Sequence, residues 1–156
     1  GGRETWTNKG LSVMGPQINE NLAPVGWAAS SPSWSPDAAR VAFSAMPDAG
    51  HVWGGPEADT ALMQRRLWIV AIPSGELRQL TFESAFRDEF PLWSSDGSTL
   101  LFVRMDQEGK ASLWQIDARG GDPYMLVFGL SRSDLGQDPS EVFGHIAWYD
   151  LFDWDQ

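Results

Sequence analysis

The sequence carries PSWSPDAARVAF at residues 32–43 and PLWSSDGSTLLF at residues 91–102, two stretches that align without a gap at an offset of 59 residues. Pro, Trp, Ser, Asp and Phe recur at matching positions. A second pair, LWIVAI at 67–72 and LWQIDA at 113–118, aligns at an offset of 46 residues. The chain therefore contains an internal repeat. Because the two offsets differ by 13, the first copy holds 13 extra residues between its two motifs.

Each copy of the repeat predicts four short strands joined by tight turns. The Pro-Asp and Asp-Gly pairs that follow the Trp-Ser motif are strong turn signals, since Asp bonds to its own backbone and Gly accepts positive φ. Proline is tolerated where a strand opens. We therefore expect strands at 32–35, 40–44, 67–72 and 77–81 in the first copy, and at 91–94, 100–104, 113–117 and 124–128 in the second.

The second strand of each copy is apolar on both faces, with VAF at 41–43 and LLFV at 100–103. A sheet with one wet face alternates apolar and polar residues. Continuous apolar strands fit sheets that stack face to face, which is how the blades of a β-propeller are arranged. The fold class predicted is all-β, with propeller blades of four-stranded antiparallel sheets. An ordinary β-sandwich is the alternative.

These motifs together resemble the Pro-Asp propeller repeat of TolB-like proteins. The resemblance rests on Pro-x-Trp-Ser-Pro-Asp, the apolar strand, Leu-Trp, a Gly turn and the Leu-Thr junction at 80–81, and it covers residues 29–128. The first copy departs from the pattern at Ala38, where Gly is usual, and at Ala29, where an Asp precedes the Pro by three. The resemblance implies a non-catalytic binding or scaffold protein that presents a broad face to protein partners in the bacterial cell envelope, with a periplasmic location.

The repeat divides the chain into four segments. We expect a partial preceding blade at 1–28, a blade at 29–82 with an inserted loop at 46–66, a second blade at 83–128, and a loop with a closing or partial strand at 129–156. That is about three blades, whereas propellers close with about 4–8. We therefore expect the chain to be part of a longer propeller or to close with a second copy. An incomplete ring exposes strand edges, so self-association is a further expectation.

Composition limits the possible partners. The 156 residues carry a formal net charge of −10 and a pI near 4.4, which argues against nucleic acid, because phosphate binding needs a Lys and Arg footprint. No apolar stretch is long enough to span a bilayer, and the first residues, Gly-Gly-Arg-Glu, are not a signal peptide. The absence of cysteine leaves the compartment open.

No complete catalytic or cofactor motif is present. Ser12 lies in Gly-Leu-Ser-Val-Met-Gly, where Met14 takes the place of the second Gly that a nucleophile elbow requires. The two histidines, His51 and His145, are widely separated and lack the spacing of a zinc site. The Gly-Gly pairs lack the Lys of a phosphate loop. The sequence therefore predicts no catalytic residue, no metal and no cofactor.

Two segments are candidate binding sites. The 46–66 insertion is one, since long loops in compact all-β domains are usually functional or disordered. Trp53 there is either a contact residue or a cover for apolar surface. The other is the triplet Arg87-Asp88-Glu89, which precedes the first strand of the second copy. Asp88 there either caps a turn or contacts a cation or partner at the mouth of the ring. The candidate residues are His51, Trp53, Glu57, Asp59, Arg87, Asp88 and Glu89.

Three hypotheses follow for function. The first is the protein-binding scaffold that the resemblance implies. The second is an accessory propeller segment of a larger enzyme, such as a prolyl-oligopeptidase-like peptidase or a carbohydrate-active enzyme, whose catalytic domain is absent from this sequence. The third is a structural half-propeller that dimerises.

Overall fold

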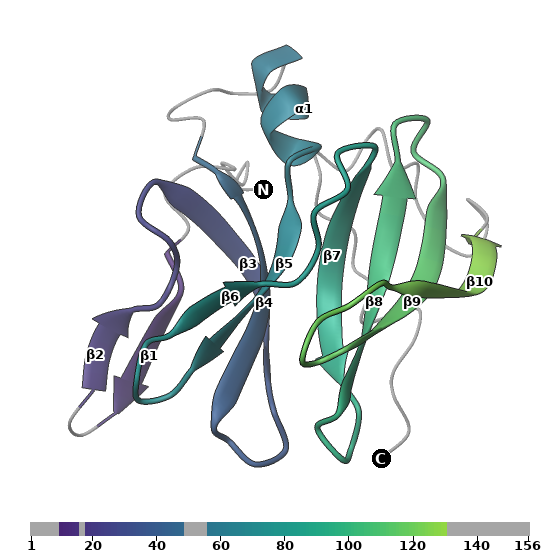
Figure 1. The fold of residues 1–156 in the computed structure, drawn as a ribbon. Coiled ribbons are helices and arrows are strands. Elements are labelled where there is room, and N and C mark those ends of the chain that lie inside the picture. Colours follow the sequence, from purple (N-terminus) through teal and green to yellow (C-terminus); the bar gives the residue numbers. More distant parts are fainter. Residues whose placement is uncertain (1–9, 16–17, 49–55, 131–156) are drawn as a thin grey trace, which may run out of the picture.

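The computed structural model describes residues 10–15, 18–48 and 56–130. Two four-stranded antiparallel sheets stand side by side in it, and a two-stranded sheet lies on the outer side of the first (Figure 1). The elements are β1 Ser12–Gly15, β2 Ile18–Asn21, β3 Trp27–Trp34, β4 Arg40–Pro47, α1 Pro56–Leu62, β5 Arg66–Ala71, β6 Leu77–Gln79, β7 Phe86–Trp93, β8 Thr99–Asp106, β9 Ala111–Asp117 and β10 Tyr124–Leu130.

Each four-stranded sheet follows the chain order, β3-β4-β5-β6 and then β7-β8-β9-β10. We call them blade 1 and blade 2. Strands adjacent in sequence are hydrogen-bonded neighbours, so each blade is an up-and-down meander. The all-β fold of propeller blades is confirmed, and within the described residues no closed ring or barrel is present.

The second strands are buried on both faces, as the sequence predicts. Residues 41–46 of β4 and 100–105 of β8 are all buried. One face of β8 packs against blade 1 through a cluster that spans both sheets. Its buried members are Ala42, Leu67, Ile69, Leu80, Trp93, Leu100, Phe102, Ile116 and Ala118. The core of the molecule therefore lies between blades rather than within one of them.

The first strands are longer than the sequence predicts. We expected proline to open them, but β3 and β7 each begin five residues earlier and contain the proline in their interior. The reason is a β-bulge, because the pairing with the second strand shifts between Ser30 and Ser33 and between Glu89 and Leu92. The bulge takes Pro32 and Pro91 out of the hydrogen-bond ladder, where a missing N–H costs nothing.

The turn after each first strand has the same hydrogen bonds in both blades. In blade 1, the Ser35 hydroxyl donates to the Asp37 carboxylate at 2.5 Å and accepts from the backbone N–H of Arg40 at 2.9 Å. In blade 2, Ser94 makes the equivalent bonds to Asp96 at 2.7 Å and from Thr99 at 3.0 Å. The recurring Ser-x-Asp motif is therefore explained by the turn that it closes.

Ala38 stands where the repeat usually has Gly, and it nevertheless adopts the backbone geometry of that turn. Its φ of 54° lies in the left-handed region, close to the 67° of Gly97 at the equivalent position. An alanine in this region is strained by its Cβ, whereas glycine is not.

Ala38→Gly is expected to stabilise the protein by about 0.5–1 kcal/mol, because relief of left-handed strain exceeds the added freedom of the unfolded chain. Urea denaturation followed by tryptophan fluorescence measures the change. The converse change, Gly97→Ala, introduces left-handed strain in blade 2 and also places a Cβ 3.3 Å from the guanidinium of Arg40, so it is expected to destabilise. A loss of stability on Ala38→Gly would contradict the strain argument.

Asp96 also makes the stability of this turn depend on pH. Hydrogen bonds from Ser94 and from the backbone and hydroxyl of Ser98 lower the pKa of Asp96 from 3.8 to about 2. A lowered folded-state pKa contributes stability above the unfolded value, and that contribution is lost as pH falls toward the folded value. Asp96→Asn should therefore flatten the fall in stability between pH 4 and pH 2 in a urea-denaturation series. Asp122→Asn, at another exposed position, serves as the control. If it flattened the fall in stability as much as Asp96→Asn does, the role given to Asp96 would be refuted.

Candidate functional site

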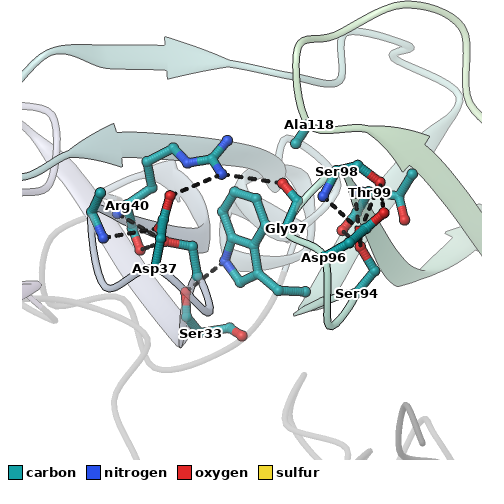
Figure 2. Close-up of polar contacts among 12 residues, drawn as sticks. Ser33, Asp37, Arg40, Ser94, Asp96, Gly97, Ser98, Thr99 and Ala118 are labelled. Carbon is teal, nitrogen blue, oxygen red and sulfur yellow. Dashed lines mark hydrogen bonds and ion pairs between the residues drawn. The ribbon is translucent and has the colours of Figure 1, made fainter. Parts of the chain in front are cut away.

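Two bands of contacts join blade 1 to blade 2, one near each end of the strands. The band at the Ser-x-Asp turns centres on Trp93, whose indole N–H donates to the backbone oxygen of Ser33 at 3.0 Å. The guanidinium of Arg40 lies 4.6 Å above the Trp93 ring and donates to the backbone oxygen of Gly97 at 3.1 Å. Figure 2 shows Arg40 between Asp37 and Gly97. Trp93 is buried as a result.

The second band is a cluster of charged side chains at the start of β7, which we call the ionic cluster. It holds four arginines and three carboxylates, a composition that is unusual for the interior of a protein. Most of its members are buried, and Asp88 has no exposed surface. The members are Arg65, Arg66, Glu83, Arg87, Asp88, Glu89 and Arg104.

Asp88 and Arg104 form the centre of the ionic cluster. They lie opposite each other on β7 and β8, and the guanidinium donates to both carboxylate oxygens at 2.7 and 3.0 Å. Burial raises the pKa of Asp88, and the hydrogen bonds from Arg104 oppose that rise. Burial on its own lowers the pKa of Arg104, but hydrogen bonds with Asp88 and Glu83 raise it. The bidentate geometry and the cationic partner favour the ionised pair.

Arginines from the end of the insertion complete the ionic cluster. Arg65 donates to Glu89 at 2.8 Å, and its backbone oxygen accepts from the N–H of Asp88 at 3.1 Å. Arg66 donates to the backbone oxygen of Phe86 at 2.8 Å. The segment between α1 and β5 is therefore fixed to the first strand of blade 2.

The structure corrects the expected position of Arg87, Asp88 and Glu89. The sequence suggested a linker before the strand, with Asp88 capping a turn. All three residues instead lie inside β7 and are buried, and Asp88 binds Arg104 rather than a turn. The early start of β7 produces this difference. The three residues lie where blade 1 meets blade 2. Because their side chains are buried, their direct contact with a partner stays a prediction that their exposure does not support.

The other candidate residues lie in the insertion, and the structure describes only some of them. Glu57 and Asp59 are in the first turn of α1 and are exposed. His51 and Trp53 fall outside the described residues, as does His145. Sequence reasoning missed Arg104, because regular pairing across the Asp-Gly turn would place Asp88 opposite Met105, and the bulge between Glu89 and Leu92 shifts its partner to Arg104.

α1 packs on the end of blade 1 where β3 begins and β4 ends. Leu62 forms a small buried cluster with Ala28 and Met46. Figure 1 shows the helix standing beyond the ends of the strands. The exposed face of α1 is therefore held on a fixed support.

The described residues form neither a metal-binding cluster nor a membrane-spanning helix. Among residues 10–15, 18–48 and 56–130, no three His, Asp or Glu side chains are placed to hold a metal ion. No helix in that part of the chain has the length and apolar character needed to cross a membrane.

Blade 1 replaces the central ion pair by apolar residues. At the positions of Asp88 and Arg104 it carries Ala29 and Ala45, which are also directly opposite each other. In blade 2 the Arg104 guanidinium lies 5.0 Å from the ring of Phe86 and 4.8 Å from that of Trp114. In blade 1 the equivalent rings, Trp27 and Trp68, contact each other directly with centroids 5.4 Å apart. The larger Trp27 therefore fills the space that arginine fills in blade 2.

Asp88→Ala is expected to destabilise the protein by about 3–5 kcal/mol, because it leaves Arg104 buried beside an incomplete set of partners. The double variant D88A/R104A should lose less than the sum of the two single variants. The triple variant F86W/D88A/R104A copies blade 1 and should be more stable than the double variant. Urea denaturation of all four variants measures the coupling, and simple additivity would contradict it.

Comparisons with known proteins agree with this architecture. The Tol-Pal system protein TolB 1 of Novosphingobium aromaticivorans is 36% identical over 75 residues, which are 47% of this chain and 16% of that protein. The chain thus spans a small part of the length of this curated relative. No protein-family model matches the chain.

Solved structures share the fold. A putative TolB from Agrobacterium tumefaciens matches with a TM-score of 0.53 and 20% identity, over 72% of this chain and 39% of that one. TolB from Acinetobacter baumannii matches with a TM-score of 0.51 and 17% identity, over 74% and 25% of the two chains. A putative dipeptidyl aminopeptidase IV from Bacteroides ovatus gives a TM-score of 0.52 and 15% identity, over 70% and 20%. The described residues therefore form consecutive blades of a TolB-like β-propeller.

Proposed function

We propose that this chain is a non-catalytic, protein-binding segment of a TolB-like propeller that acts outside the cytoplasm, and that its partner contacts α1. The observation that carries the proposal is a helix added to one blade only. The connection between β4 and β5 runs over residues 48–65, whereas that between β8 and β9 has only residues 107–110. An added element that the blade does not need for its own pairing is a natural place for a specific contact.

The support of α1 suits recognition. Its apolar side is packed on blade 1, and the arginines that follow it are fixed to β7 by ion pairs and backbone hydrogen bonds. A surface held in place before binding loses less conformational entropy when a partner docks. The ionic cluster thus serves the contact indirectly, as a support.

The charge of the surface supports one kind of partner. Glu57 and Asp59 lie on the exposed side of α1, and the whole chain has a formal net charge of −10. Such a surface favours a protein partner with a basic patch, because opposite potentials steer the encounter and fix the orientation. The relative from Novosphingobium aromaticivorans is named as a component of the Tol-Pal system, which supports an extracytoplasmic setting for the contact.

Charge reversal on α1 tests the proposal. A partner is first identified by cross-linking in bacterial envelope extract, and its affinity is then measured by calorimetry. E57K/D59K should weaken binding about tenfold or more and reduce its dependence on salt. Glu76→Lys, at an exposed position in the turn between β5 and β6, is the matched control and should bind as the unmodified chain does.

Two results would overturn the proposal. One is equal binding by E57K/D59K and the unmodified chain, which would place the contact elsewhere. The other is turnover of a peptide or polysaccharide substrate by this chain, which would favour the alternative of an enzyme segment.

A further inference from the structure

The tryptophan of the Trp-Ser motif has opposite surroundings in the two blades. Trp34 and Trp93 occupy equivalent positions at the end of β3 and β7. Trp93 is 7% exposed and Trp34 is 48% exposed. The difference comes from the neighbour, because Trp93 is covered by Ser33 and Arg40 of the preceding blade.

The sheet that precedes blade 1 contains equivalents of the third and fourth strands of a blade. The N–H of Leu22 donates to the oxygen of Leu11 at 2.6 Å, and at the equivalent place in blade 1 the N–H of Leu80 donates to Leu67 at 2.8 Å. Leu11, Val13, Leu22 and Ala23 pack on blade 1, as third and fourth strands do between complete blades. In the described residues, β1 pairs with β2 alone, whereas β5 and β9 each have a neighbour on both sides.

Both observations indicate the same two strands. The residues that cover Trp93 lie on β3 and at the start of β4, the first and second strands of a blade. Among the described residues, the edge of β1 that faces away from β2 is open, and it is the edge on which a third strand pairs with a second strand. A single hairpin of first and second strands would therefore cover Trp34 and pair with β1. The apolar contact of β1 and β2 with blade 1 continues directly into this surface.

We infer that the face of blade 1 around Trp34, together with the open edge of β1, is a docking site for a β-hairpin of this same repeat. The hairpin presents a backbone oxygen to the Trp34 indole N–H and an arginine to the ring face. Contact with a cation over the ring and burial of the indole both favour this occupant. This inference stands independently of the function proposed for α1.

The chain provides its own probe for the site. A peptide of residues 27–47 is the hairpin formed by β3 and β4, and it contains the Ser33 and Arg40 that cover Trp93. Unlabelled peptide is added to ¹⁵N-labelled protein, and the indole N–H signal of Trp34 is followed by NMR. The signal should shift on binding. An Arg40→Ala peptide should bind more weakly, because the cation over the ring is lost.

Variants of the protein distinguish this contact from nonspecific binding of the peptide to exposed aromatic side chains. Trp34→Ala should weaken peptide binding about tenfold or more, as expected for a central aromatic contact. Phe82→Ala removes an aromatic side chain that is 70% exposed at another place, and it should leave binding unchanged. Equal weakening by both variants would overturn the inference.

A fused hairpin keeps the test decisive when the free peptide is too unfolded to bind. The sequence 27–47 is joined ahead of Gly1, so that residues 1–11 connect it to β1. That connection is longer than the one at 107–110 and shorter than the one at 48–65. The fusion should slow hydrogen exchange at the Trp34 indole and raise the melting temperature. Unchanged exchange would overturn the inference, as would a dimer of the unmodified chain that Trp34→Ala dissociates, because a second copy would then occupy the face.

Discussion

Each blade of this protein has two apolar faces, and that property governs the rest of the structure. β4 and β8 are buried from both sides, so neither sheet can satisfy its hydrophobic surface alone. The largest buried cluster contains residues of both blades. At about 25 cal/mol per Å² of apolar surface, such burial dominates the stability of a small β-domain. Stacking of one blade on the next is therefore the event that makes either of them stable.

The two blade junctions solve the same packing problem with different chemistry. Between blade 1 and blade 2, an arginine lies between two aromatic rings and is neutralised by a carboxylate on the opposite strand. Between the two-stranded sheet and blade 1, the corresponding space is filled by two tryptophans in contact, beside two alanines. Loss of one ionic partner alone would leave a buried charge, which is why both positions differ together.

Much of the fold could be predicted from the sequence, because the repeat fixes strand order and turn chemistry locally. The Ser-x-Asp turns and the apolar second strands depend on neighbours within about ten residues, and the structure has them where they were expected. The first strands were predicted too short because a bulge allows proline inside a strand, and nothing in the spacing of the motif announces a bulge. That error placed Asp88 in a linker and hid its pairing with Arg104. The resemblance in sequence and the shared fold agree on a TolB-like propeller. The identity of a partner could not be predicted in this way, because it depends on residues outside the repeat motif.

The division between repeated and unrepeated residues also separates structural roles from candidate functional ones. Residues that match between the copies close turns and fill the spaces between blades. α1 has no counterpart in blade 2, yet its flanking arginines bind the first strand of that blade, so the added helix and the joint share one set of side chains. Arg65 and Arg66, which follow α1, are therefore bonded directly to β7. The same ionic contacts hold the inserted segment and join the two blades. A substitution that breaks these contacts is therefore expected to affect both the position of the segment and the packing of the blades.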